Sequence, residues 1–166
     1  MKPVGLALIQ MGKTGLELVK SHPNVLPKET LNEIVLKSMP LSAKDGDYAS
    51  STAGGCVFES YIFSIPGKRR RNIASLVVIF DKENYDRKTI RRFCSFTITE
   101  LKKNNLADAE TISEILPNLY NGLSERRMKI KISSVVTLSF DFDEKEQKDK
   151  KPEEKFVDSL KEDFWK

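Results

Sequence analysis

The sequence predicts an α/β domain of the α+β type, a five-stranded, mostly antiparallel sheet with helices on both faces. Two stretches carry this prediction, because residues 4–11 (VGLALIQM) and 73–80 (IASLVVIF) are apolar at almost every position. A strand without a polar face is buried on both sides, so a sheet that contains two such strands needs a layer of helix on each face. Segments with helical spacing of apolar residues are present to form both layers.

The N-terminal region is expected to form a hairpin followed by a helix. Residues 16–21 alternate between apolar and polar side chains, and the turn sequence GKTG joins them to the strand at 4–11. A helix is expected over residues 28–39, because Pro27 suits a first turn and Leu31, Ile34 and Val35 share one helical face. Pro40 ends this helix.

The middle of the chain is expected to form a hairpin with a basic tip. Strands over 57–65 and 73–80 flank Pro66-Gly67 and four consecutive cations, Lys68, Arg69, Arg70 and Arg71. A short, weak strand at 48–52 precedes this hairpin, and Gly54-Gly55 turns the chain between them.

Two amphipathic helices are expected next. Asp86 is a suitable N-cap for a helix over residues 87–103, and Asp108 is a suitable N-cap for a second helix with an apolar stripe from Ile112 to Leu123. Pro117 lies inside that stripe, where a proline should kink or split the helix.

The stretch from residue 128 to 142 alternates with the period of a strand. Seven apolar side chains share one face of it: Met128, Ile130, Ile132, Val136, Leu138, Phe140 and Phe142. A single strand of this length exceeds the usual five or six residues, so it should bend near Ser133-Ser134 or pair outside the first domain. Because so large an apolar face should not stay in water, we expect strand addition at a sheet edge, in cis or in a dimer or second subunit.

These patterns divide the chain into three parts. Residues 1–124 form the domain, 125–143 form the additional strand segment, and 144–166 form a charged tail that is expected to be flexible. The tail ends in an amphipathic segment with Phe156, Leu160 and Phe164 on one helical face, which is either a docking helix or a frayed end.

Charge is distributed unevenly along the chain. The whole chain has a net charge of +4, whereas residues 141–166 contain ten acids and seven lysines, so residues 1–140 carry about +7. A basic domain of this kind suggests an acidic partner, which could be a protein, an anionic membrane or nucleic acid. A partner-binding surface is predicted at the hairpin tip and the start of the following helix: Lys68, Arg69, Arg70, Arg71, Arg87, Lys88, Arg91 and Arg92. The alternative for the tip is a solvated turn.

No constellation of catalytic or metal-binding residues is evident, so we expect a non-enzymatic protein without a cofactor. Residues 7–14 (ALIQMGKT) match a relaxed phosphate-loop pattern, but they read as a strand and not as a flexible loop before a helix. His22 is not part of any evident pattern of nucleophilic or metal-ligating residues. Cys56 and Cys94 are expected to be reduced thiols. Two alternatives stay open, namely a nucleotide-hydrolysing enzyme of the P-loop type and a basic nucleic-acid-binding protein, although aromatic partners for bases are missing. No segment has the length or hydropathy of a membrane span, and a cytoplasmic location is expected.

The order strand, strand, helix, weak strand, strand, strand, helix, helix resembles the longin fold of the longin/roadblock superfamily. In that family the first and last strands lie together in the middle of the sheet and the second and third lie at its edges. Two segments of this chain are apolar on both sides and fit the central places, namely GLALIQM and NIASLVVIF. The edge places fit the weaker segments LELVKS and DYASST. The related roadblock and profilin arrangements begin with a helix, whereas this chain enters a strand by residue 4. The resemblance covers residues 1–124.

The resemblance implies a protein-interaction module of vesicle trafficking or small-GTPase regulation. Longin-like domains pair with another such domain or bind a peptide along the sheet and helix. Small trafficking longin proteins often end in a coiled-coil helix and a membrane anchor, which this sequence does not show. We therefore expect a scaffold or regulatory subunit whose partner is a small GTPase or another longin/roadblock-type subunit, with a homodimer and peripheral contact with an anionic membrane as further possibilities.

Overall fold

The computed structural model describes residues 2–67 and 72–142. The predicted basic tip, Lys68 to Arg71, and the predicted tail, 144–166, lie outside the described residues. Seven strands and three helices are present in the described ranges: β1 Gly5–Gly12, β2 Gly15–His22, α1 Lys28–Lys37, β3 Tyr48–Ala53, β4 Cys56–Ser64, β5 Ile73–Phe80, α2 Arg87–Lys103, α3 Ala109–Glu125, β6 Met128–Lys131 and β7 Thr137–Phe140.

Five of the strands form one antiparallel sheet in the order β2-β1-β5-β4-β3. The predicted α+β class and five-stranded sheet are thereby confirmed. The strands that are apolar on both faces, β1 and β5, are neighbours near the centre, and the weaker strands β2 and β3 are its two edges. The observed bounds of the seven elements through α2 differ from the predicted ones by two residues at most, as at Lys37, where α1 ends, and α3 begins directly after the predicted cap Asp108.

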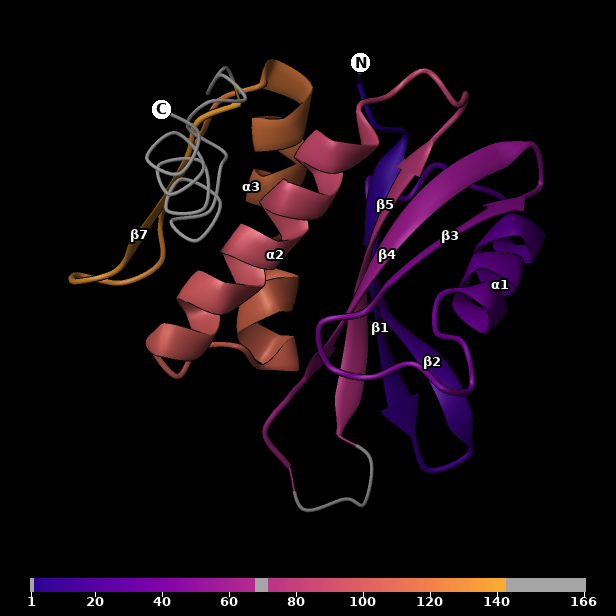
Figure 1. Cartoon of the computed structure of the whole chain (residues 1–166), viewed down its shortest axis with the longest axis horizontal. Coiled ribbons are helices and arrows are strands. Elements are labelled where there is room, and N and C mark those ends of the chain that lie inside the picture. Colours follow the sequence, from indigo (N-terminus) through magenta and orange to yellow (C-terminus); the bar gives the residue numbers. More distant parts are fainter. Residues whose placement is uncertain (1, 68–71, 143–166) are drawn as a thin grey trace, which may run out of the picture.

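Helices cover both faces of the sheet, with α1 on one face and α2 and α3 on the other (Figure 1). Alternate residues of the central strands divide between the two layers. Leu6 and Leu8 of β1 belong to the core under α2 and α3, whereas Ala7 and Ile9 belong to the core under α1. All four side chains are fully buried, which is why residues 6–9 of β1 are apolar on both faces.

Helix α3 continues without interruption from Ala109 to Glu125 and contains Pro117. The expected split at this proline is therefore wrong. A proline cannot donate to the carbonyl four residues earlier, which here is that of Ser113. The ammonium group of Lys20 on β2 donates to this carbonyl at 2.9 Å and takes the place of the missing N–H. A cation on the neighbouring strand therefore makes the proline tolerable inside the helix.

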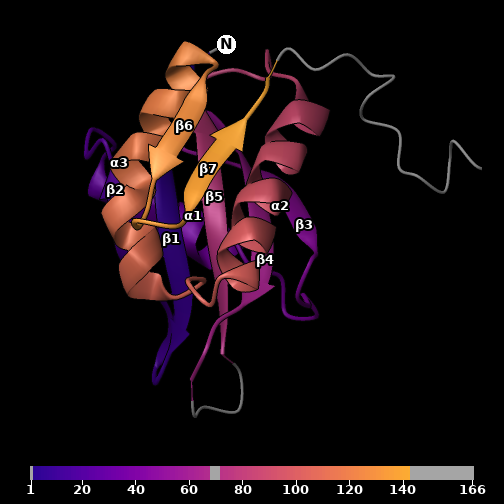
Figure 2. The ribbon, with the colours of Figure 1, turned by 90° about the vertical axis from the view of Figure 1, so that its left-hand side faces the viewer.

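The stretch expected as one additional strand folds back on itself as two short strands. β6 and β7 form a separate two-stranded antiparallel sheet with Met128 opposite Phe140 and Lys131 opposite Thr137. Figure 2 shows this hairpin lying over α2 and α3, on the side away from the large sheet. A tight approach to α3 is possible because Gly122 has no side chain, since a Cβ there would lie 3.1 Å from Cβ of Met128.

The turn at Ser133-Ser134 confirms the expected bend. The Ser133 hydroxyl accepts hydrogen bonds from the backbone N–H groups of Val135 and Val136, at 3.4 and 3.1 Å. Such local side-chain bonds stabilise a turn that contains neither glycine nor proline.

None of the helices within residues 2–67 and 72–142 combines the length and the apolar composition needed to span a lipid bilayer.

We predict that Lys20→Met lowers the free energy of unfolding by about 1–3 kcal/mol, because it leaves the partly buried Ser113 carbonyl without a donor. The loss should be smaller when Pro117→Ala is present, since an alanine N–H at position 117 bonds to the same carbonyl. Urea unfolding of the two single variants and the double variant measures this coupling. Equal losses in both backgrounds would show that Lys20 does not serve the carbonyl.

Candidate functional site

The four basic residues of α2 that the sequence assigns to partner binding do not form one continuous free patch. Arg87 and Arg91 turn toward the sheet, Arg92 lies over the Phe140 ring with its guanidinium carbon 4.7 Å from the ring centre, and Lys88 is exposed. The structure therefore brings two of the four together and separates the others.

Arg87 and Arg91 converge on one buried acid, Glu59 of β4, whose side chain is 2% exposed. Nε of Arg87 is 2.7 Å from Oε1, and Nε of Arg91 is 3.4 Å from Oε2. Ser50 of β3 donates to Oε2 at 2.6 Å, and the Tyr85 hydroxyl donates to Oε1 at 2.9 Å. A carboxylate without these partners would be costly to bury, so the cluster fixes the start of α2 against β3 and β4.

Tyr85 acts as a neutral hydrogen-bond donor in this cluster. Burial and the adjacent Glu59 carboxylate raise the pKa of its hydroxyl above the usual value. Its ring stacks on Phe80 with the ring centres 4.3 Å apart, which holds the hydroxyl at Glu59.

Arg91 also connects the buried cluster to the sheet edge. Its guanidinium carbon lies 4.9 Å from the centre of the Tyr48 ring, within the range of a cation–π contact. Tyr48 belongs to the edge strand β3 and remains 37% exposed. A basic and aromatic surface therefore adjoins the edge of the sheet.

The backbone of β3 offers hydrogen-bonding groups on its outer side. The N–H of Ile62 donates to the carbonyl of Asp47 at 2.9 Å, which places the bonded pairs of the β3–β4 ladder at every second residue from Asp47. The N–H and C=O groups of Tyr48, Ser50 and Thr52 consequently point away from β4. The Thr52 carbonyl accepts a bond from Lys37 at 2.9 Å, whereas no described group bonds the outward backbone of Ser50.

The seven side chains assigned to dimer formation or strand addition lie inside the same chain. Met128, Ile130, Val136, Leu138, Phe140 and Phe142 are each at most 8% exposed, and Ile132 is partly buried. The aromatic members pack on α2, with the ring centre of Phe93 5.6 Å from those of both Phe140 and Phe142. The hairpin thus buries these side chains within the same chain. The need to cover them is therefore no longer an argument for a dimer.

An apolar depression of 350 Å³ lies on the other face, between the end of α1 and the turn from β1 to β2. Its lining includes Met11, Leu16 and Met39, with Leu36 74% exposed and Leu41 95% exposed at its rim. No charged side chain contributes to the lining, so this depression suits apolar groups of a partner.

The residues that match a phosphate loop do not have the geometry of one. Gly5 to Gly12 is strand β1, and Lys13-Thr14 is the turn into β2, whereas a phosphate loop needs a following helix. Among residues 2–67 and 72–142, no group of three His, Cys, Asp or Glu side chains is placed to bind a metal. Both thiols are free, and burial raises the pKa of Cys56 and Cys94.

Sequence reasoning missed Glu59 as the centre of the cluster. A signal was present, because Glu59 is the one acid in the strand from Cys56 to Ser64, and Arg87 and Arg91 are one turn apart on the next helix.

A search with models of known protein families finds no match to this chain, and a search of curated protein sequences finds none.

We predict that Arg87→Ala with Arg91→Ala lowers the free energy of unfolding by about 3 kcal/mol, since the Glu59 carboxylate stays buried without cations. Adding Glu59→Gln to this double variant should restore part of the loss, because an amide needs no countercharge. Urea unfolding provides the measurement. Lys88→Ala is the matched control on the same helical turns and should change stability by no more than about 0.5 kcal/mol. No recovery with glutamine would mean that charge burial is not the cause.

A pH dependence is predicted from the N-cap of α2. The Thr89 hydroxyl donates to Asp86 at 2.6 Å and, with backbone donors, lowers the pKa of that carboxyl. A lowered pKa in the folded state adds stability above the unfolded pKa of about 4, and this contribution is lost as pH falls through the folded pKa. Asparagine caps helices but does not titrate there. The difference in free energy of unfolding between wild type and Asp86→Asn should therefore become smaller in acid. Urea unfolding at neutral pH and at several acid pH values measures this difference. A difference that stays constant with pH would contradict the prediction.

Proposed function

We propose that this chain is a non-enzymatic interaction module of the longin type. It acts as a scaffold or regulatory subunit in a complex of the kind that serves vesicle trafficking or small-GTPase regulation. Its partner is a second longin- or roadblock-type subunit, and such a pair is a platform for a small GTPase.

The sheet order supports this proposal. β1 and β5 lie together and β2 and β3 lie at the edges, as the longin arrangement requires, with one helix on one face and two on the other. Helices and buried side chains cover both faces of the five-stranded sheet, so no broad open sheet face is left for a substrate among residues 2–67 and 72–142. The buried polar cluster around Glu59 is satisfied by internal partners, which favours a structural role over catalysis.

The observation that carries the proposal is the outer edge of β3. Its free backbone groups lie beside the Tyr48–Arg91 contact, so backbone pairing and a basic, aromatic rim are available at one place. An edge strand with unpaired N–H and C=O groups is a ready template for another strand. We therefore assign partner pairing to β3 and the adjacent face of α2.

We predict that Ser50→Pro abolishes partner binding while leaving the fold intact. Proline removes the outward N–H of Ser50 at the middle of β3, and it is tolerated on edge strands because no bond to β4 is lost there. Ser50→Ala is the matched control, since both variants lose the hydroxyl bond to Glu59 but alanine keeps the N–H.

The measurement is affinity purification from the native lysate with wild-type, Ser50→Ala and Ser50→Pro baits, followed by mass spectrometry. Longin- or roadblock-type proteins should be retained by the first two baits and lost with the third. Light scattering of the three purified proteins tests whether the partner is a second copy. Retention of the same partners by Ser50→Pro, with circular dichroism unchanged, would refute pairing through β3.

A further inference from the structure

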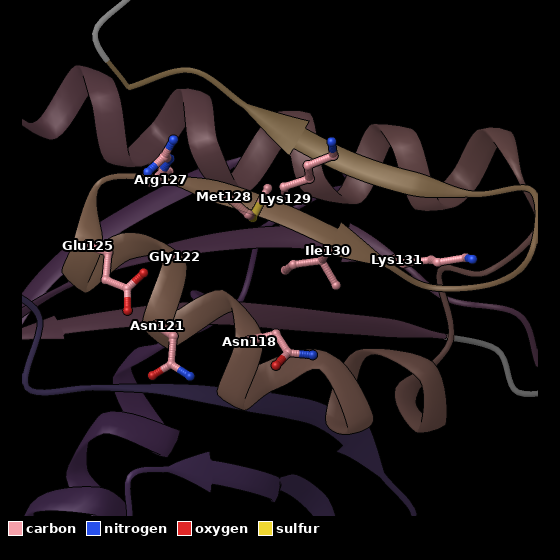
Figure 3. Close-up of a pocket in the computed structure, with 9 residues that line it drawn as sticks. All are labelled: Asn118, Asn121, Gly122, Glu125, Arg127, Met128, Lys129, Ile130 and Lys131. Carbon is pink, nitrogen blue, oxygen red and sulfur yellow. The ribbon is translucent and has the colours of Figure 1, made fainter.

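A second open strand edge lies outside the longin-like part of the chain, at β6. A groove of 270 Å³ runs between this strand and the last turns of α3, with β6 along one side and Asn118, Asn121 and Glu125 along the other (Figure 3). The floor of the groove is formed where Gly122 meets Met128. Because Gly122 lacks a side chain, β6 approaches α3 closely at this point.

The backbone of β6 points two sets of hydrogen-bonding groups into this groove. The N–H of Ile132 donates to the carbonyl of Val136 at 2.9 Å, so the bonded pairs of the β6–β7 ladder continue at Ile130 with Leu138 and at Met128 with Phe140. The N–H and C=O groups of Lys129 and Lys131 therefore face away from β7 and toward α3. No described backbone group bonds them.

The side chains along β6 add a row of positive charge. Lys129 and Lys131 are exposed on the outer face of β6, two residues and about 7 Å apart, and Arg127 is exposed directly before the strand. Within the described residues, none of these three side chains makes an ion pair or hydrogen bond. Glu125 is the one acid among the residues that line the groove, so the lining has a net charge of +2.

An extended peptide also places alternate side chains on one face, about 7 Å apart. Carboxylates at every second residue of such a peptide match the spacing of the three cations. Its other face turns toward α3, where the side chains of Asn118, Asn121 and Glu125 line the groove.

We propose that β6 binds an acidic, extended peptide of a partner protein as a third strand of the β6–β7 sheet. The backbone groups of Lys129 and Lys131 supply the pairing, and the cations of Arg127, Lys129 and Lys131 select carboxylates on the outer face. This site is separate from the β3 edge and does not depend on the proposed pairing there.

The chain's own C-terminal sequence has the wrong charge pattern for this site. Residues 143–155 contain six acids and five lysines, so lysines would repeatedly face the three cations. A partner's peptide without interspersed lysines avoids that repulsion.

The test uses the full chain and a short capped peptide in which glutamate and valine alternate, with fluorescence anisotropy as the measure of affinity. We expect saturable binding that Lys129→Ser with Lys131→Ser weakens at least about tenfold, or 1.4 kcal/mol. Lys28→Ser with Lys44→Ser is the matched control, since it removes the same charge from exposed positions elsewhere and should leave affinity within about twofold.

Two further probes separate strand pairing from simple charge attraction. The same peptide with N-methyl groups on one edge should lose at least about tenfold in affinity, and binding of the unmodified peptide should slow hydrogen exchange at the Lys129 and Lys131 amides.

Several results would overturn the proposal. Equal affinity for the methylated peptide would reduce the site to an electrostatic surface, and slow exchange of both amides in the free full chain would mean that the chain's own tail fills the edge. Binding to phosphatidylserine vesicles that depends on Lys129 and Lys131, without peptide binding, would assign these cations to a membrane.

Discussion

The burial of β1 and β5 on both faces is the constraint on which the rest of the structure depends. Both strands lack a polar face, and each large aliphatic side chain that they bury contributes about 1.5–3 kcal/mol. They can be covered only if neither lies at an edge and each face of the sheet has its own helical layer. The order β2-β1-β5-β4-β3, with α1 opposite α2 and α3, meets both requirements. This order makes β2 and β3 the two edge strands of the sheet, and a partner strand can pair only with an edge strand.

The cluster around Glu59 follows from the same layering. β4 has to fill the space beneath α2 with its inward side chains, and Glu59 occupies one of these positions at 2% exposure. Two arginines of α2 and two hydroxyl groups offset the cost of burying its charge. Ion pairs of this kind fix an orientation more than they add stability, and here the orientation is that of α2 relative to the β3 edge. The surface proposed for pairing is thus positioned by a buried acid.

The sequence was sufficient for those parts of the fold that depend on local periodicity. Apolar runs located β1 and β5, and helical spacing located α2 to the residue. The split at Pro117 did not occur because its compensation comes from Lys20, 93 residues before Ser113, and no local pattern contains such a contact. For residues 128–142 the alternation identified the buried face correctly. It did not show that α2 and α3 of the same chain cover this face. Glu59 was missed as a cluster because its partners come from three separate segments, which only the tertiary structure brings together.

The two open edges at β3 and β6 differ in charge, and the partners proposed for them differ accordingly. An unprotected edge strand invites pairing between identical copies, and lysine on the edge is one device that prevents it. On β3 the exposed positions Ser50 and Thr52 are neutral, so a similar strand meets no repulsion there. On β6 a second copy would bring Lys129 and Lys131 against the same lysines, which opposes self-pairing. An acidic strand reverses the sign of that interaction. The residues that oppose pairing of β6 with itself are therefore the same residues that favour the proposed peptide rich in carboxylates.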